Sequence, residues 1–230
     1  MSEFVALEKL SLVDFDGKIA CTLFTKNCNF CCPFCHNKDL ALSSVDTFIP
    51  FEEILAFLKT RVNKIQGVCI SGGEPTLMPD LIDKIKAIKA LGFQIKLDTN
   101  GYRPDVLEEL INLNLIDYVA MDVKNTLEKY ELTTGLVNIN TDKILKSINL
   151  LKEERVDYEF RTTLVNEFHN IEDIKKIATL LKGAKRYFLQ KYVKNANCIN
   201  KNLTPVPYHV VKEFEKKLKT SIEYVGLRGY

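Results

Sequence analysis

Short apolar runs alternate with segments of helical periodicity along the chain. In the helical segments apolar residues recur every three or four positions, which indicates one buried face. These patterns predict six strands at Lys18–Phe24, Val68–Ser71, Gln94–Asp98, Ile116–Met121, Tyr158–Val165 and Arg186–Gln190. Ile222–Leu227 is expected to form a last short strand. Helices are expected at Phe51–Lys59, Pro79–Leu91, Pro104–Leu113, Thr141–Glu154, Ile171–Leu181 and Pro207–Lys219.

Six strand–helix units in order predict an α/β fold with a parallel sheet and right-handed crossovers. Six units fit either a doubly wound open sheet or a barrel, so the pattern leaves these two architectures open. The chain shows no internal repeat and no low-complexity linker, and residues 1–230 are expected to form a single domain. In both architectures ligands bind at the carboxyl ends of the strands.

Polar residues follow the predicted strands at the point where each strand ends. A cysteine-rich loop follows the first strand, and Ser71–Thr76 (SGGEPT) follows the second. Asp98–Gly101 (DTNG) ends the third strand, and Asp122–Lys124 follows the fourth. Because these loops share one rim of a parallel sheet, we expect a functional site there.

Charge and the N-terminal sequence exclude several classes of function. The 230 residues carry 32 basic and 30 acidic side chains, a balance that argues against a nucleic-acid or membrane-surface binder. The N-terminus lacks the basic and apolar regions of a signal peptide, and no run approaches the ~18 apolar residues of a membrane span. We therefore expect a cytoplasmic protein whose thiols stay reduced, so that clustered cysteines bind metal or act chemically.

The loop CNFCCPFCHN places Cys28, Cys32 and Cys35 in a C-x3-C-x2-C pattern, with Cys31 beside the second of them. A zinc site would need a fourth ligand, for which Cys31, His36 and Cys198 are candidates. A 4Fe–4S cluster would take three thiolates on three irons and leave the fourth iron open to a substrate. The remaining cysteines, Cys21, Cys69 and Cys198, are expected to be buried small apolar residues.

The motif CNFCCPFC resembles the radical S-adenosylmethionine (radical SAM) signature, with Phe34 at its aromatic position. SGGEPT resembles the GGE segment of that family, and DTNG strengthens the match. The string SLVDFDGKIACTLFTKNCNFCCPFCHNKDL and the terminal VGLRG are similar to glycyl-radical-enzyme activating proteins, particularly those of anaerobic ribonucleoside-triphosphate reductase. The resemblance implies a partial (β/α)6 barrel, with the cluster at the C-terminal rim.

Three positions depart from the family pattern, although none of them is a presumed cluster ligand. Asn27 stands where Gly is usual, and Asn tolerates left-handed backbone better than most residues. Cys31 replaces a basic residue, and Asp16 replaces a common Pro.

The resemblance also implies roles for individual residues, each with a plainer structural alternative. Cys28, Cys32 and Cys35 would hold a 4Fe–4S cluster. Residues that would bind S-adenosylmethionine are Phe34, His36, Gly72, Gly73, Glu74, Pro75, Asp98, Thr99, Asn100, Asp122 and Lys124. Arg161 and Gln190 join this set if they point into the barrel. Alternatively, the glycines form a tight turn, Asp98–Asn100 caps a helix, and Asp122 pairs with Lys124 on the surface. His169 and His209 have no expected role.

The expected activity is therefore that of a radical SAM activase. One electron, from a flavodoxin or ferredoxin, would drive cleavage of S-adenosylmethionine to a 5′-deoxyadenosyl radical. That radical would then generate a glycyl radical on a partner, anaerobic ribonucleotide reductase before others. Alternatives are activation of another glycyl radical enzyme such as pyruvate formate-lyase, a small-molecule reaction such as 7-carboxy-7-deazaguanine synthesis, and a zinc or iron–sulfur adaptor without catalysis.

Overall fold

Eight strands form one sheet in which each strand pairs with its neighbours in sequence. The computed structural model describes residues 4–42 and 47–230. Strands are β1 (Phe4–Ser11), β2 (Ala20–Thr25), β3 (Gly67–Gly72), β4 (Gln94–Thr99), β5 (Tyr118–Asp122), β6 (Asp157–Leu164), β7 (Arg186–Lys191) and β8 (Tyr224–Arg228). Strands β2 to β8 are parallel, whereas β1 pairs antiparallel with β2.

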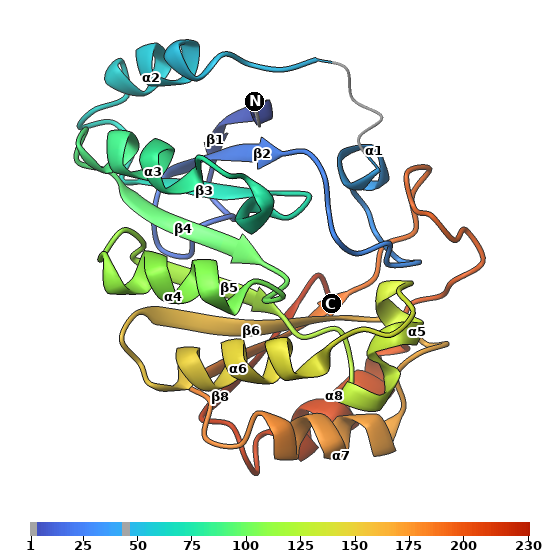
Figure 1. The fold of residues 1–230 in the computed structure, drawn as a ribbon. Helices are drawn as coiled ribbons and strands as arrows, with labels where there is room; N and C mark the ends of the chain where they lie inside the picture. The colour runs from blue at the N-terminus through green and yellow to red at the C-terminus, as the bar shows by residue number, and fades with distance from the viewer. Residues whose placement is uncertain (1–3, 43–46) are drawn as a thin grey trace.

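The sequential strand order settles the architecture. A doubly wound sheet reverses its strand order at a switch point, whereas this sheet runs from β1 to β8 without reversal. Within the described residues β8 and β1 do not pair, so the barrel is open along one seam. The fold is thus the expected partial barrel of the TIM type, with its helices packed on the outside of the sheet (Figure 1).

Helices lie between the strands in sequence. They are α1 (Lys38–Ala41), α2 (Phe51–Lys59), α3 (Leu81–Lys89), α4 (Pro104–Asn112), α5 (Tyr130–Thr134), α6 (Thr141–Lys152), α7 (Ile171–Leu180) and α8 (Tyr208–Leu218). The longer helices cover the outer side of the sheet, whereas α1 and α5 lie beside the cysteine loop (Figure 1). Short 3₁₀ turns lie at Pro75–Leu77 and Leu127–Lys129. All six predicted strand–helix units and the last short strand are confirmed, each with boundaries within two residues of the prediction.

The apolar periodicity predicted the long helices correctly because one face of each is buried against the sheet. On α3 the fully enclosed side chains are Leu81, Ile85 and Ile88, spaced by four and three residues. The sequence around α7 also encodes its start, because Asn170 and Asp173 form a reciprocal capping box. These helices fix the strands from outside and leave the inner surface of the barrel for polar chemistry.

Besides the two 3₁₀ turns, three elements were absent from the sequence prediction. Strand β1 buries Phe4 and Val5 but exposes three consecutive residues in its second half, so it shows no regular alternation. Helices α1 and α5 have four and five residues, which is too short for a helical period to be visible. None of the helices that the structure describes is long and apolar enough to cross a membrane.

Candidate active site

One pocket at the carboxyl ends of the strands gathers nearly all of the predicted site residues. The members that line it are Cys28, Cys32, Phe34, Cys35, His36, Gly72, Gly73, Glu74, Asp98, Thr99, Asn100, Asp122, Lys124, Arg161 and Gln190. Pro75 does not line the pocket; it is buried at the start of the 3₁₀ turn that follows Glu74. Six loops and strand ends, far apart in sequence, therefore face the same space.

The cysteine loop is held in shape by backbone hydrogen bonds on two sides. Asn27 has a φ of 69°, the left-handed conformation expected for this position. Its N–H donates to the carbonyl of Leu40, and the N–H of Cys28 donates to the carbonyl of Ala41, at 2.9 and 3.2 Å. On the other side the N–H of Cys31 donates to the carbonyl of Thr134 on α5, at 2.8 Å.

The segment Gly73–Glu74 packs directly on the backbone of that loop. A Cβ on Gly73 would lie 2.0 Å from the carbonyl oxygen of Asn27, so no other residue fits without displacing the chain. The N–H of Glu74 donates to the same oxygen at 2.7 Å. The glycine is required by this close approach between two loops and does more than permit a turn.

Three thiols of the loop, Cys28, Cys32 and Cys35, are free and face the pocket. Burial and the nearby Glu74 raise the pKa of Cys28 to about 12, and burial raises that of Cys32 to about 11, although Lys124 opposes the rise. Buried thiols of this kind become thiolates when a metal centre supplies compensating positive charge.

No three His, Cys, Asp or Glu side chains in residues 4–42 and 47–230 are arranged to hold one metal ion. A 4Fe–4S cluster makes a different demand, because its three thiolates bind three separate irons. The donor set of three free cysteines around one pocket fits such a cluster.

Glu74 is the most enclosed acid of the rim, with 1% of its surface exposed. Its Oε1 accepts hydrogen bonds from the N–H and hydroxyl of Thr76 and from the hydroxyl of Thr99, and its Oε2 accepts from the N–H of Asn100 at 2.7 Å. Burial raises the pKa of Glu74 despite these donors. The carboxylate therefore ties the end of β3 to the end of β4.

Asn100 extends this connection to the cysteine loop. Its side-chain amide donates to Oδ1 of Asn29 at 2.8 Å and lies 3.8 Å from Sγ of Cys28. A chain of contacts thus runs from Glu74 through Asn100 to the first cysteine, and it fixes the position of that thiol relative to the rim.

Charged side chains alternate in sign across the pocket floor. Asp98 accepts from Lys96 at 2.5 Å and from Ser71 at 3.1 Å, and it pairs with Arg161 at 3.3 Å. Arg161 also donates to Asp122 at 2.9 Å, and Asp122 in turn pairs with Lys124 at 2.9 Å. Burial alone would raise the pKa of Asp98, but Arg161 and Lys96 outweigh it and lower that pKa to about 2.

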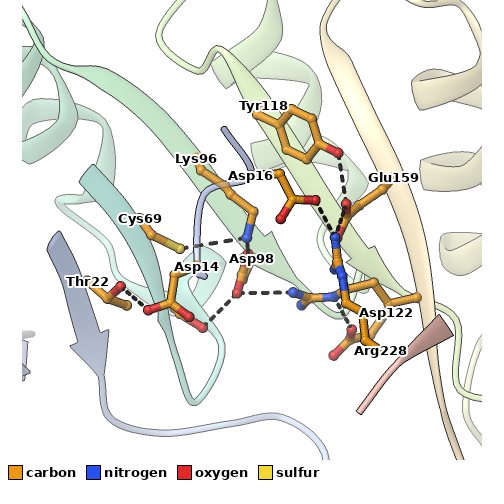
Figure 2. A network of polar contacts seen from close by, with 12 residues as sticks. Asp14, Asp16, Thr22, Cys69, Lys96, Asp98, Tyr118, Asp122, Glu159 and Arg228 are labelled. Atoms are coloured by element: carbon orange, nitrogen blue, oxygen red, sulfur yellow. Dashed lines mark hydrogen bonds and ion pairs between the residues drawn. The ribbon is translucent and has the colours of Figure 1, made fainter. Parts of the chain in front are cut away.

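The ionic network continues down the barrel interior. Figure 2 shows Lys96 between Cys69 and Asp98, and Arg228 between Glu159 and Asp16. Glu159 is fully buried and is bound by two nitrogens of Arg228 and by the hydroxyl of Tyr118. Because Arg228 ends β8 and Asp16 precedes β2, this ion pair spans the open seam.

The structure resolves several alternatives that the sequence left open. Arg161 points inward, but it is already paired with two acids, so it does not lack an anion. Asp122 and Lys124 form an ion pair that is mostly buried, not a surface pair. Gln190 lines the pocket. Cys21, Cys69 and Cys198 are buried as expected.

Sequence reasoning missed several residues of the site. Phe30, Asn37, Ala41, Ser71 and Thr163 line the pocket as well. His169, which had no assigned role, is buried, and its Nε2 lies 3.0 Å from the carbonyl oxygen of Lys124. Alternate residues of a strand share a face. Lys96, two residues before Asp98, and Thr163, two residues after Arg161, could therefore have been predicted to face the barrel interior. No local signal marks His169.

The fold, the three-cysteine loop and the rim together define a radical SAM enzyme. Residues 22–181 match the model of the radical SAM superfamily, and the chain belongs to that superfamily. Its members use a 4Fe–4S cluster and S-adenosylmethionine. Within the superfamily the chain belongs with the glycyl-radical enzyme activating enzymes, as two relatives show.

A Methanocaldococcus jannaschii protein named as a glycyl-radical enzyme activating enzyme is 37% identical over 228 residues, covering 95% of this chain and 92% of the relative. The pyruvate formate-lyase-activating enzyme of Clostridium pasteurianum is 30% identical, covering 80% of this chain and 77% of its own. The crystal structure of Streptococcus suis SuiB bound to S-adenosylmethionine has a similar fold, with a TM-score of 0.69 at 16% identity, covering 88% of this chain and 48% of SuiB.

Proposed function

We propose that this protein activates a glycyl radical enzyme, with anaerobic ribonucleoside-triphosphate reductase as the first candidate partner. The observation that carries the proposal is the single pocket in which three free thiols meet the ends of five parallel strands. A 4Fe–4S cluster held by Cys28, Cys32 and Cys35, and reduced by one electron from a flavodoxin or ferredoxin, would supply the reductive cleavage of S-adenosylmethionine to a 5′-deoxyadenosyl radical able to abstract a glycine hydrogen.

The thiols of Cys28, Cys32 and Cys35 are proposed to hold the cluster. Backbone hydrogen bonds join their loop to Glu74, just after β3, through Asn27 and to α5 through Cys31, so its shape does not depend on metal alone. Asn100 orients the first of these thiols from the side of β4. A preformed loop of this kind lowers the cost of ordering the ligands when the cluster is inserted.

The methionine end of S-adenosylmethionine is proposed to bind at Gly72, Gly73, Glu74 and Pro75. Glu74 stabilises a cationic amine there while its hydrogen bonds hold the rim together. Lys124 supplies a positive charge for the carboxylate, and Asp122 holds its ammonium group in place at 2.9 Å. The ion pair with Asp122 also keeps Lys124 charged. Burial alone would lower the pKa of Lys124, but the nearby carboxylate of Asp122 outweighs burial and raises that pKa.

The nucleoside end is proposed to contact the aromatic and amide groups of the rim. Phe34 is buried beside Phe168, with ring centroids 6.0 Å apart, and Lys124 lies 5.9 Å from its ring. His36 lies against the ring of Tyr192 and is bonded to Asn195. Asp98, Thr99, Asn100, Asp122, Arg161 and Gln190 complete the polar wall toward the ribose. These contacts position the cofactor and limit water in the pocket.

The proposal includes a cytoplasmic location, where thiols stay reduced. Pyruvate formate-lyase is the second candidate partner, favoured by the 30% identity to its activating enzyme.

Anaerobic reconstitution tests the proposal. We expect four irons per chain and reductant-dependent 5′-deoxyadenosine, together with a glycyl radical on the partner detected by electron paramagnetic resonance. One zinc per chain with no iron would instead support the adaptor, and 5′-deoxyadenosine released only with a small molecule such as a 7-deazaguanine precursor would support the small-molecule enzyme.

A further inference from the structure

Two segments outside the strand rim flank the cysteine loop. The end of α5 touches it at Cys31, where a Cβ on Gly135 would lie 2.4 Å from the carbonyl oxygen of Cys31. Residues 192–203 touch it from the other side, because the N–H of Asn200 donates to the carbonyl of Pro33 at 2.8 Å and Asn195 bonds to His36. Figure 1 shows α5 and this orange loop beside the loop that follows β2.

Apolar side chains on both flanking segments face solvent. Leu132 on α5 is 53% exposed, Val137 just after α5 is 83% exposed, and Val193 is 57% exposed. Each of the three lies in a segment that contacts the cysteine loop, and exposed apolar side chains among polar groups are typical of interaction surfaces. We call these three residues, with the lysines described next, the outer-loop surface.

The charged residues at the ends of the cysteine loop and on the two flanking segments are mainly basic. Lys26 and Lys38 stand before and after the cysteine loop, and Lys194 and Lys201 lie in the flanking loop. None of these four lysines forms an ion pair with the part of the chain that the structure describes. The acids on these segments are Asp39 and Glu131, and Glu131 accepts a hydrogen bond from the N–H of Asn138. The surface therefore carries a net positive charge.

We propose that the outer-loop surface docks an acidic one-electron carrier protein, an inference that rests on the proposed function. The pocket side of the cysteine loop faces the cofactor and must admit the glycine of the partner enzyme. The outer side offers a short path through the backbone of Cys31 and Pro33. One electron leaves the reduced group of the carrier, which is oxidised by one electron, and the cluster is reduced by one electron. Opposite charges speed such encounters, and the apolar residues exclude water at the contact.

The test is the rate of cluster reduction by a flavodoxin hydroquinone under anaerobic conditions. The variant Lys194→Glu/Lys201→Glu is expected to lower the second-order rate about tenfold or more at low salt. Lys216→Glu/Lys217→Glu on α8 changes the net charge equally at exposed positions elsewhere and is expected to keep the rate. Raising the salt concentration should slow the unchanged protein more than the Lys194/Lys201 variant.

A reductant that needs no docking separates this inference from the proposed function. Photoreduced deazaflavin should drive equal cleavage of S-adenosylmethionine in all three proteins. If flavodoxin reduces both charge-reversed variants equally fast, the docking proposal is wrong while the proposed function stands. No cleavage by the unchanged protein with deazaflavin would overturn both.

The apolar part of the surface is tested separately. Val137→Asp is expected to slow flavodoxin-driven reduction several-fold, whereas Leu113→Asp, at another exposed position at the end of α4, is not. If Lys194→Glu/Lys201→Glu instead lowers only the glycyl radical yield with deazaflavin, the surface binds the radical acceptor and the carrier proposal is contradicted.

Discussion

Glu74 is hydrogen-bonded to Asn27 through the backbone: the N–H of Glu74 donates to the carbonyl oxygen of Asn27 at 2.7 Å. Gly73 places its Cα where a side chain would strike that same oxygen. The cysteine loop and the rim of β3 are therefore a single packed unit. Displacing one of them moves both the thiols and the acid that is proposed to receive the cofactor amine.

Gly73→Ala tests this packing. A methyl group 2.0 Å from the oxygen of Asn27 must push the loop away. We expect iron content to fall well below four per chain and cleavage of S-adenosylmethionine to drop at least about a hundredfold, since small misplacements of reacting groups have such effects. Gly92→Ala is the control, because that position has a φ of 91° but open space around it. Gly92→Ala should lower the free energy of unfolding by about 1–2 kcal/mol and leave the iron content unchanged. Equal iron content in the Gly73→Ala and Gly92→Ala variants would contradict the packing argument.

Cysteine replacements test the cluster ligands. Cys28→Ala, Cys32→Ala and Cys35→Ala are each expected to abolish the cleavage of S-adenosylmethionine, because three thiolates are needed to hold three irons. Cys31→Ala is the neighbouring control and is expected to keep both the iron and the activity, because only the backbone of Cys31 is used to fix the loop. Iron analysis and 5′-deoxyadenosine assays report the result, and normal cleavage in any of the first three variants would remove the assignment.

The pH dependence of stability should reflect Asp98. Its pKa is lowered from 3.8 to about 2, so its ion pairs contribute stability at pH values above 3.8 that is lost as the pH falls through about 2. Lys96→Met removes one partner and is expected to lower the free energy of unfolding at pH 7 by about 3 kcal/mol, with a smaller further loss between pH 4 and pH 2.

Urea unfolding at pH 7, 4 and 2 measures this effect. Lys86→Met is the control, because Lys86 pairs with Asp83 on the exposed face of α3. That variant should change the unfolding free energy by less than about 1 kcal/mol and keep the full acid sensitivity. Identical behaviour of the two variants would show that the buried pair does not stabilise the barrel.

His169 is expected to position Lys124 without touching the cofactor. Its Nε2 bonds the carbonyl of Lys124 and its Nδ1 lies 3.1 Å from the backbone of Val165. His169→Leu should raise the KM for S-adenosylmethionine about tenfold and leave iron content intact, because the loss falls on the carboxylate-binding lysine. The exposed His209→Leu is the control; an unchanged KM in both would contradict the role of His169.

The sequence predicted the long helices and strands well because the spacing of apolar residues within each of them reflects which side is buried. Ile85 and Ile88 mark α3, and the run around Ile70 marks β3, without any knowledge of their neighbours. The strand-end residues followed from one rule, since parallel strands share a rim. This rule predicts Asp98 and Lys124 at the rim, and both line the pocket.

Long-range contacts were not predictable from local pattern. Nothing in the residues around His169 indicates that it bonds to Lys124, 45 residues away. Likewise, the contact of α5 with Cys31 depends on how two loops meet, and the inward Arg161 was paired by Asp98 and Asp122 from two other strands. Such pairings depend on the closure of the barrel.

The most direct measurement is electron paramagnetic resonance on an anaerobic mixture of the reconstituted protein, reductant, S-adenosylmethionine and a candidate glycyl radical enzyme. We expect a glycyl radical signal on the partner that matches the 5′-deoxyadenosine formed. The signal should disappear when the Cys32→Ala variant replaces the unchanged protein. Formation of 5′-deoxyadenosine with no glycyl radical on anaerobic ribonucleotide reductase, pyruvate formate-lyase or any other glycyl radical enzyme tried would contradict the proposed function.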